Sequence, residues 1–300
     1  MMELNEKQAL AQAMRANTPK LALPHVTPQE LERYPCSVRP VEVKVPGSTD
    51  VTVYLTVPFQ VEVGAPLFVN YHGGGFIRGR DARYELFCRR LACTFRCVVV
   101  DVDYALAPDY PFPVAVEQAI ASAKWAREQA PSLGCDPDKV VLFGQSAGGN
   151  LVANVCMAEA DAPAVRPLAA VIAYAPMDFK TDPADKFHPE RDMPAERARG
   201  YNALYCTPEK TGDWRVSPLF APPERLAAFP QTLIITAGDD SLAPEGEEFA
   251  RSLARAGVET TCKRFVGCLH GFFINRTDTW EDGIELIHRY LRNVLQDSAR

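Results

Sequence analysis

The feature that most constrains this chain is an alternation of short, continuous apolar runs with amphipathic helical patterns. The apolar runs occupy Pro66–Tyr71, Cys97–Val102, Lys139–Phe143, Leu168–Tyr174, Gln231–Thr236 and Glu259–Phe265. The helical patterns lie between or after them, at Ala82–Phe95, Val114–Gln129, Ala147–Ala160, Glu245–Ala256 and Trp280–Leu295. Strands that are buried on both faces are apolar throughout, and parallel strands are usually connected through helices. The alternation therefore predicts an α/β fold, with a mostly parallel central sheet flanked by helices.

Two earlier segments alternate apolar and polar residues instead. Val41–Val45 and Val51–Val57 both show a period of two, and the turn-forming stretch Pro46–Asp50 separates them. Such alternation is typical of strands with one exposed face. We expect these segments to form an antiparallel hairpin at one edge of the sheet.

Residues 1–40 and 177–216 do not fit the alternation. The first segment is helical and then rich in proline, and the second is polar, charged and rich in proline. A long insertion within a compact domain usually serves a function, although it can also be a tolerated surface loop. Because loops at the carboxyl ends of parallel strands often carry binding sites, we expect both segments to be cap elements. The core then consists of residues 41–176 and 217–300.

Composition excludes some classes of partner. The chain has 300 residues and a formal net charge of −6, without the run of lysine and arginine that nucleic acid or an anionic membrane surface would require. Its apolar stretches have the length of strands, so we expect no membrane span. The first residues lack the apolar segment and small-residue cleavage site of a secretory signal.

The cysteines favour a reducing compartment. There are nine of them, an odd number, and they are scattered without a C-x-x-C pair. We interpret them as buried free thiols in the cytoplasm, where free cysteine behaves as a small core residue. A redox-sensing thiol is the alternative.

The segment Gly144-Gln145-Ser146-Ala147-Gly148 fits the pattern G-x-S-x-G and lies between a predicted strand and a predicted helix. In that context the pattern is typical of a sharp turn that exposes a serine hydroxyl at the carboxyl end of the sheet. The turn requires small residues two before and two after the serine, and Gly144 and Gly148 meet this requirement. The following helix directs its free N–H groups at developing negative charge. We interpret Ser146 as a nucleophile.

A second motif, His72-Gly73-Gly74-Gly75-Phe76, directly follows the apolar run Pro66–Tyr71. Successive glycines weaken strands and helices, but they let bare backbone approach a ligand. Before a nucleophile turn, such a loop supplies oxyanion-hole donors, together with the residue after the nucleophile, here Ala147. We expect His72 to brace the loop. A plain flexible turn is the alternative, and a phosphate-binding loop would need different glycine spacing and a G-K-[ST] ending.

A serine hydroxyl is a poor nucleophile without a neighbouring base. His270 lies in a loop after the last predicted strand, downstream of Ser146, which fits the chain order serine, acid, histidine. His25, His188 and His288 lie in the proline-rich N-terminal region, the insertion and the last helix. His270 is therefore the expected base.

The acid should lie between Ser146 and His270, after a strand. Asp239 and Asp240 follow the run Gln231–Thr236 and offer two adjacent carboxylates. The acid accepts a hydrogen bond from the imidazole and stabilises the imidazolium. Spacing alone does not choose between Asp239 and Asp240.

Together these motifs resemble the hormone-sensitive-lipase-like family of α/β-hydrolases, in its bacterial esterase branch. The resemblance covers the chain from about residue 65 to the end. It rests on His72–Phe76, Tyr104–Pro108, Gly144–Asn150 and Leu269–Phe272. It implies an α/β-hydrolase fold with a helical cap, built from the N-terminal region and from the insertion that precedes the acid.

The resemblance also implies roles for individual residues. The oxyanion donors of the family correspond to the N–H groups of Gly74, Gly75 and Ala147. Its acid occupies the fourth place of an Ala-Glu-x-Asp-x-Leu pattern, which matches Ala237–Leu242 with Asp240 in that place. The resemblance thus favours Asp240 as the acid.

The chain departs from the family pattern at positions beside the chemistry. Gln145 stands where the family usually has Asp, Gly238 replaces the usual Glu, and Ala243-Pro244 replace a common Arg-Asp pair. These departures affect the expected acyl pocket and pH optimum, and they leave the expected reaction class unchanged.

The resemblance implies a carboxylesterase that acts on short- to medium-chain acyl esters through an acyl-enzyme intermediate. Its partner is then a small-molecule ester, and neither a metal nor an organic cofactor is implied. The same residues could serve an amidase, a deacetylase or an acyltransferase. A non-catalytic receptor of this fold is a further alternative, but such receptors typically lack the histidine that is present here as His270. A homodimer through the edge of the last strand is left open.

Overall fold

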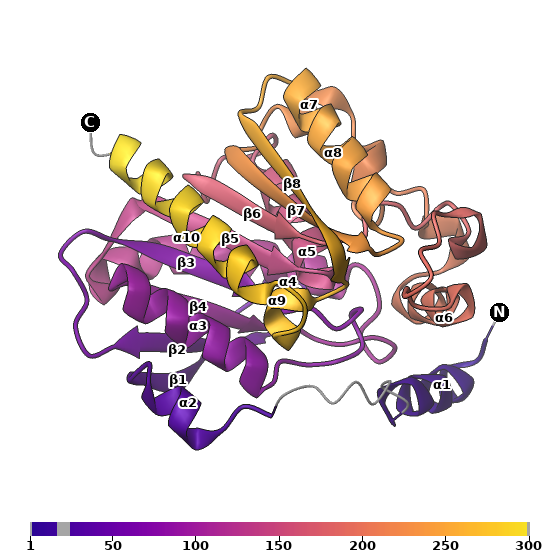
Figure 1. Cartoon of the computed structure of the whole chain (residues 1–300), viewed down its shortest axis with the longest axis horizontal. Helices are drawn as coiled ribbons and strands as arrows, with labels where there is room; N and C mark the ends of the chain where they lie inside the picture. Colours follow the sequence, from indigo (N-terminus) through magenta and orange to yellow (C-terminus); the bar gives the residue numbers. More distant parts are fainter. Residues whose placement is uncertain (1, 17–24, 299–300) are drawn as a thin grey trace.

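The computed structural model describes residues 2–16 and 25–298, and the strands among them form a single sheet (Figure 1). Its strand order is β1-β2-β4-β3-β5-β6-β7-β8. β2 runs antiparallel to β1 and β4, and all other neighbours are parallel. The strands are β1 (Cys36–Val43), β2 (Val51–Pro58), β3 (Ala65–Tyr71), β4 (Val98–Asp103), β5 (Cys135–Gln145), β6 (Ala169–Ala173), β7 (Gln231–Asp239) and β8 (Thr260–Leu269). The predicted α/β fold is confirmed.

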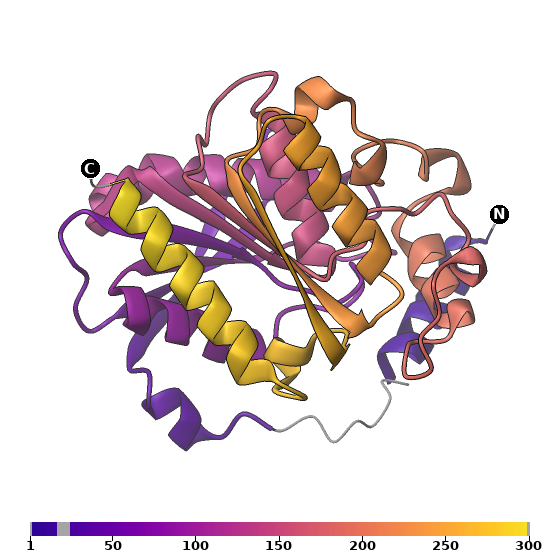
Figure 2. The ribbon, with the colours of Figure 1, turned by 45° about the horizontal axis from the view of Figure 1, so that its top comes forward.

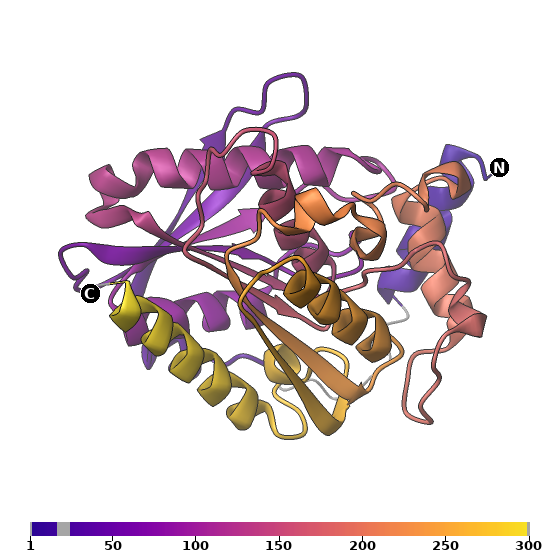
Figure 3. The same ribbon diagram turned by 90° about the horizontal axis from the view of Figure 1, so that it is seen from above.

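Helices cover both faces of the sheet (Figure 3). One face carries α4 (Val114–Gln129), α5 (Ala147–Ala158) and α8 (Ala243–Arg255). The other carries α3 (Ala82–Phe95) and α10 (Trp280–Asp297). Because the central strands are covered on both sides, every residue of β3 and β6 is buried. This packing holds the carboxyl ends of the strands in fixed positions.

Shorter elements complete the description. They are α2 (Pro28–Glu32), η1 (Ala130–Leu133), η2 (Pro183–Asp185), η3 (Pro208–Lys210), η4 (Pro218–Phe220), α7 (Pro223–Leu226) and α9 (Phe272–Asn275). None of the helices formed by residues 2–16 and 25–298 combines the length and apolar character that a membrane crossing requires.

The edge hairpin differs from its predicted boundaries. β1 begins at Cys36 rather than at Val41, and Cys36 pairs with Pro58 of β2. Pro40 lies inside this strand, where the sequence favoured an irregular segment. Proline is tolerated there because β1 is an edge strand and one side of it needs no ladder donor. The sheet therefore starts within the segment assigned above to the cap.

Each of the two segments predicted as cap elements contributes a helix beyond the carboxyl ends of the parallel strands, and these two helices lie side by side (Figures 1 and 2). They are α1 (Leu4–Ala16) and α6 (Ala195–Tyr205) of the insertion. Their shared core contains Ala11, Met14, Ile77, Ala107 and Leu204. Of the segment predicted as the N-terminal cap element, residues 1 and 17–24 lie outside the described residues. The short helix α2 packs near α3 instead.

All nine cysteines lie within the described residues, and each is free. Cys88, Cys97, Cys135, Cys156, Cys206 and Cys268 are buried. Cys36 and Cys93 are half-buried, with 3.6 Å between their sulfur atoms. Cys262 is exposed, so the expectation of burial is wrong for this residue.

Candidate active site

Ser146 occupies the turn between β5 and α5. Its backbone has φ 52° and ψ −123°, a conformation that is strained for a residue with a side chain. A Cβ atom on Gly144 would collide with the Gly148 carbonyl, and one on Gly148 would collide with the carbonyl oxygen of Tyr71. The two glycines therefore allow the strand, the turn and the helix to approach one another. This is the geometry of a nucleophile elbow.

The glycine loop runs directly beside this turn. Gly74 and Gly75 both have positive φ, 130° and 60°. Among the described residues, the N–H groups of Gly74 and Gly75 find no hydrogen-bond acceptor. Ala147 is the first residue of α5, and the N–H groups of a first helical turn have no acceptor within the helix. These three donors are available to an anionic oxygen.

His270 follows β8 and reaches Ser146. Its Nε2 lies 2.9 Å from Oγ of Ser146, and its Nδ1 lies 2.7 Å from Oδ2 of Asp240. Both distances are those of hydrogen bonds. About a third of the His270 side chain is exposed, so the imidazole is accessible to a substrate and to water.

The structure distinguishes the two adjacent aspartates. Asp240 is only 2% exposed, and its second carboxylate oxygen accepts a hydrogen bond from the backbone N–H of Leu242. Asp239 pairs instead with Arg191 at 3.1 Å. Asp240 is therefore the carboxylate that orients His270.

The environment shifts the proton affinity of His270. Burial acts to lower its pKa, but the charge of Asp240 and its hydrogen bond act in the opposite direction and prevail. Asp192 contributes in the same direction as Asp240. The pKa of His270 is therefore raised above its ordinary value, and the neutral form that can accept a proton is lost at a higher pH than in a free imidazole.

Comparison with known proteins identifies the family. The family model described as the alpha/beta hydrolase fold matches residues 68–274. The chain belongs to the α/β-hydrolase family. The resemblance to its hormone-sensitive-lipase-like members is confirmed by this match and by esterase relatives.

Several relatives of this hydrolase are named as esterases. An arylesterase of Saccharolobus solfataricus is 33% identical over 210 residues, which cover 69% of this chain and 68% of the relative. The carboxylic ester hydrolase LipN of Mycobacterium tuberculosis is 34% identical, with 69% of this chain and 57% of the relative covered. Across such curated relatives, the match spans between 57% and 68% of the relative's own length.

A solved structure extends the likeness over nearly the whole hydrolase. The carboxylesterase EstE1, cloned from a metagenomic library, is 30% identical with a TM-score of 0.79. The comparison covers 98% of this chain and 98% of that chain.

His72 supports the glycine loop of the hydrolase from the protein interior. It is fully buried, and its Nδ1 lies 2.7 Å from the carbonyl oxygen of Gly73. Its ring stacks on Tyr104 with 4.2 Å between ring centroids, and the Tyr104 hydroxyl donates to the His72 carbonyl. Gly73 must be a glycine because a Cβ there would press against Tyr84 and Ser146.

Gln145, one of the departures from the family pattern, joins a buried polar network beneath the elbow. Its side-chain nitrogen donates to Asn70 at 2.8 Å, and Asn70 donates to Asp101 at 2.7 Å. Arg80 pairs with Asp101 at 2.9 Å. Sequence reasoning missed Asn70, Asp101 and Arg80, because they come from three separate segments and match no motif.

The insertion also contributes residues that sequence reasoning missed. The ring of Tyr201 in α6 occupies the space that a side chain on Gly75 would need. Arg191 and Asp192 lie beside the loops that carry Asp240 and His270. Their only signal in the sequence is that the insertion is charged.

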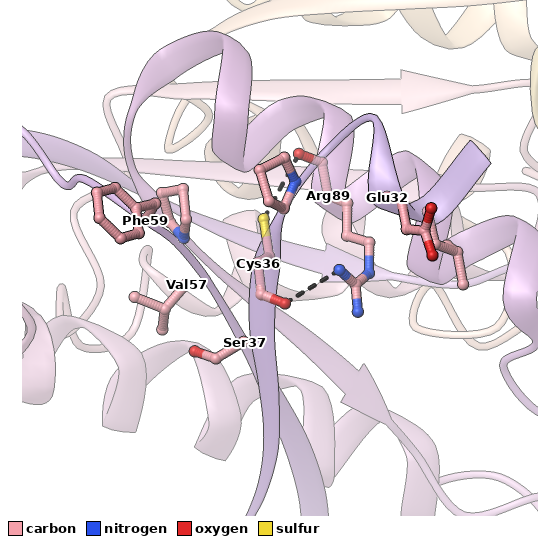
Figure 4. Close-up of a pocket in the computed structure, with 9 residues that line it drawn as sticks. Glu32, Cys36, Ser37, Val57, Phe59 and Arg89 are labelled. Atoms are coloured by element: carbon pink, nitrogen blue, oxygen red, sulfur yellow. Dashed lines mark hydrogen bonds between the residues drawn. The ribbon is translucent and has the colours of Figure 1, made fainter. Parts of the chain in front are cut away.

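A surface pocket of about 680 Å³ lies apart from these residues, at the sheet edge beside β1 (Figure 4). Its lining includes Cys36 and Ser37 of β1, Phe59, which is almost fully exposed, and Arg89 of α3. Arg89 is held by its hydrogen bond to the Cys36 carbonyl at 3.0 Å. Because Ser146 does not line this pocket, we do not assign it to the active site.

Proposed function

We propose that this hydrolase cleaves carboxylic esters through a covalent acyl-enzyme, with Ser146 as nucleophile, His270 as base and Asp240 as the orienting acid. The observation that carries the proposal is the continuous pair of hydrogen bonds, 2.9 Å from Ser146 to His270 and 2.7 Å from His270 to Asp240. Esterases among the relatives and solved structures support the same reaction class.

In the first half of the proposed reaction, His270 takes the hydroxyl proton of Ser146 while Oγ attacks the ester carbonyl. The carbonyl oxygen becomes an anion within reach of the N–H groups of Gly74, Gly75 and Ala147. Asp240 stabilises the imidazolium by its charge and its hydrogen bond. His270 then protonates the departing alcohol, which leaves an acyl group on Ser146.

In the second half, water replaces the alcohol. His270 removes a proton from the water, the resulting hydroxide attacks the acyl carbonyl, and the same N–H groups stabilise the second anion. Return of the proton to Ser146 releases the carboxylic acid. Apart from the ester and water, every group that acts in these two half-reactions is a side chain or a backbone N–H of this chain.

We propose short- to medium-chain acyl esters as substrates. The ring of Tyr201 packs on Gly75, and α1 and α6 lie over this end of the molecule. Bulk next to an oxyanion loop limits the room for a long acyl chain. A soluble small ester therefore suits this site better than an emulsified long-chain lipid.

We also propose a reducing, cytoplasmic location. Its support is that all nine cysteines are free, including the neighbouring pair Cys36 and Cys93.

Hydrolysis of p-nitrophenyl esters from acetate through butyrate to laurate tests the proposal. We expect the wild type to turn over the shorter esters and Ser146→Ala to lose about 10⁶-fold in kcat. Matched p-nitroanilides and added alcohols distinguish the alternatives. Faster cleavage of the anilides would favour an amidase, and preferential transfer to alcohols would favour an acyltransferase.

A further inference from the structure

The insertion contacts two other loops of the site through one side chain, Arg191. Its Nη1 donates to Oδ2 of Asp239 at 3.1 Å and to the carbonyl oxygen of Gly267 at 2.9 Å. Its Nη2 donates to Oδ1 of Asp278 at 3.3 Å. Since Asp239 directly precedes Asp240, the guanidinium connects the insertion to the loop that carries the acid.

Asp278 extends this connection to the loop that carries the base. Its other carboxylate oxygen, Oδ2, accepts a hydrogen bond from the backbone N–H of Leu269 at 3.0 Å. Leu269 directly precedes His270. Arg191 therefore binds two carboxylates. One belongs to Asp239, the residue before the acid, and the other belongs to Asp278, which is hydrogen-bonded to the residue before the base. Its side chain is half exposed, so each ion pair alone is weak and their effect depends on acting together.

The next residue along the chain, Asp192, interacts electrostatically with both members of the acid–base pair. Its Oδ2 is buried and accepts no hydrogen bond within the described part of the chain. Burial raises the pKa of Asp192, while hydrogen bonding with Ser241, the residue after Asp240, and with the Met193 backbone lowers it. The charge of Asp240 adds to the effect of burial, and His270 acts against it. A buried carboxylate oxygen that accepts no hydrogen bond is unfavourable unless a nearby cation compensates its charge. The protonated form of His270 is such a cation.

We propose that Arg191 and Asp192 are positioning residues for the proposed reaction. Arg191 fastens the insertion to the loops that carry Asp240 and His270. This contact holds the Asp192 carboxylate beside the acid–base pair, where it stabilises the imidazolium that forms during each half-reaction. The inference rests on the proposed function, because it takes His270 as the base.

The other groups around His270 do not duplicate this role. Asp240 holds Nδ1 through its hydrogen bond, and Ser146 lies at Nε2. The ring of Tyr174, after β6, lies edge-on with 5.1 Å between ring centroids. Arg83 of α3 is paired with Asp81, while Asp239 and Asp278 are paired with Arg191. Asp192 is thus a carboxylate that acts on the imidazole from the insertion.

The first test compares the pH dependence of kcat/KM in the wild type, Asp192→Asn and Arg191→Met. Removing the Asp192 charge makes the imidazolium less stable. The acid limb of the profile, the pH range in which kcat/KM falls as His270 is protonated, should therefore move to lower pH by roughly half a unit. Arg191→Met should shift the limb in the same direction and lower kcat about tenfold with little change in KM, because the loops lose alignment. The double variant should show the shift of Asp192→Asn alone, not the sum.

Arg199→Met is the matched control. Arg199 also belongs to the insertion and is 45% exposed, but it pairs with Asp182 within the insertion. The acid limb of kcat/KM in Arg199→Met should coincide with that of the wild type. Wild-type acid limbs in both Asp192→Asn and Arg191→Met, with Ser146-dependent hydrolysis retained, would overturn the inference. A loss of activity in Arg191→Met without a shift would also overturn it, because a merely structural contact would have that effect.

A second measurement does not depend on activity. NMR titration of the His270 imidazole, assigned with His270→Gln, reports its pKa directly in the wild type and in Asp192→Asn. A lower pKa in Asp192→Asn supports the inference even if the protein hydrolyses no ester. Equal values contradict the inference even if ester hydrolysis is fully established.

Discussion

At the scale of single residues, Asp240 and Asp239 offer a matched comparison. Asp240→Asn keeps the size of the side chain but removes the charge that holds the His270 tautomer, so kcat should fall about 10³- to 10⁴-fold. Asp239→Asn removes only the ion pair with Arg191 and should lower kcat at most about tenfold. Steady-state kinetics of the two variants on one short ester provide the measurement. Equal losses in both variants would contradict the assignment of Asp240.

The pH dependence of Asp240→Asn follows from the same geometry. The folded-state pKa of His270 is raised by Asp240, so the wild-type rate should fall below a pH that exceeds the ordinary imidazole value. Without that carboxylate the imidazolium is less favourable, and the acid limb of the residual activity should move to lower pH. An acid limb that stays in place would show that another group controls it.

Gly75 of the glycine loop has little freedom to change. It has φ 60°, and an added Cβ would collide with the Tyr201 ring. Gly75→Ala should therefore displace the backbone donor and reduce kcat by about a hundredfold or more, with a smaller effect on KM. Gly212→Ala is the control, because open space surrounds Gly212. A fully active Gly75→Ala would remove this residue from the proposed oxyanion hole.

At the scale of residues, sequence reasoning is most informative where a motif has a fixed place in the fold. It expected Ser146 and His270 to act together, and the structure brings Oγ and Nε2 to 2.9 Å from each other. The choice between Asp239 and Asp240 could not come from spacing, because the two are adjacent at the end of the same strand and differ in the partners that their carboxylates reach. Asp192 and Arg191 carry no motif, and their contacts depend on how an irregular segment packs.

At the scale of elements, the insertion is fixed to α8 by a buried ion pair. Lys186 lies 2.5 Å from Glu245, whose other oxygen accepts the backbone N–H of Met177. Burial raises the pKa of Glu245 to about 7 in spite of Lys186. Stability from this site is therefore present at low pH and is lost as the pH rises through about 7.

Lys186→Met should destabilise the protein in a pH-dependent way. Above about pH 8 the variant leaves a buried carboxylate without its cation, which typically costs about 3 to 5 kcal/mol. Near about pH 5 Glu245 is protonated, and the loss should be much smaller. Thermal unfolding at both pH values measures the difference. A melting-temperature loss that is the same at both would show that the ion pair contributes no pH dependence.

Element prediction was most accurate for long, periodic helices. The bounds of Ala82–Phe95 and Val114–Gln129 agree with α3 and α4. Asp81 caps the first of these helices, and a short proline-containing turn ends the second, so local chemistry marks their limits. The helix α6 was not predicted, because the insertion around it is charged and rich in proline, and its apolar contacts are made with segments far away in the sequence, such as α1 and Phe76. β1 was predicted too short because Pro40 is favourable only at a sheet edge.

At the scale of the whole molecule, we propose that α6 limits the acyl group of the substrate through Tyr201. If Tyr201 limits the acyl pocket, Tyr201→Ala should raise kcat/KM for longer acyl esters relative to acetate by about tenfold. Tyr110→Ala is a suitable control, since Tyr110 is a surface tyrosine that is 44% exposed. The chain-length series measures both variants. An unchanged chain-length profile in Tyr201→Ala would place the acyl pocket elsewhere.

The overall architecture could be predicted because it depends on the order of apolar runs and helical patterns along the chain. Parallel strands bring their carboxyl ends to one edge, so motifs after β3, β5, β7 and β8 meet there. Contacts between the insertion and these loops, such as Arg191 with Asp278, depend on packing across distant segments. No periodicity in the sequence encodes them.

The central claim is that Ser146 is an activated nucleophile, and active-site titration tests it most directly. Diethyl p-nitrophenyl phosphate reacts with such a serine and releases p-nitrophenol, and peptide mass spectrometry locates the phosphoryl adduct. We predict one equivalent of p-nitrophenol per chain and an adduct on Ser146, with neither in Ser146→Ala. Stoichiometric release from Ser146→Ala, or an adduct on another residue of the wild type, would contradict the account.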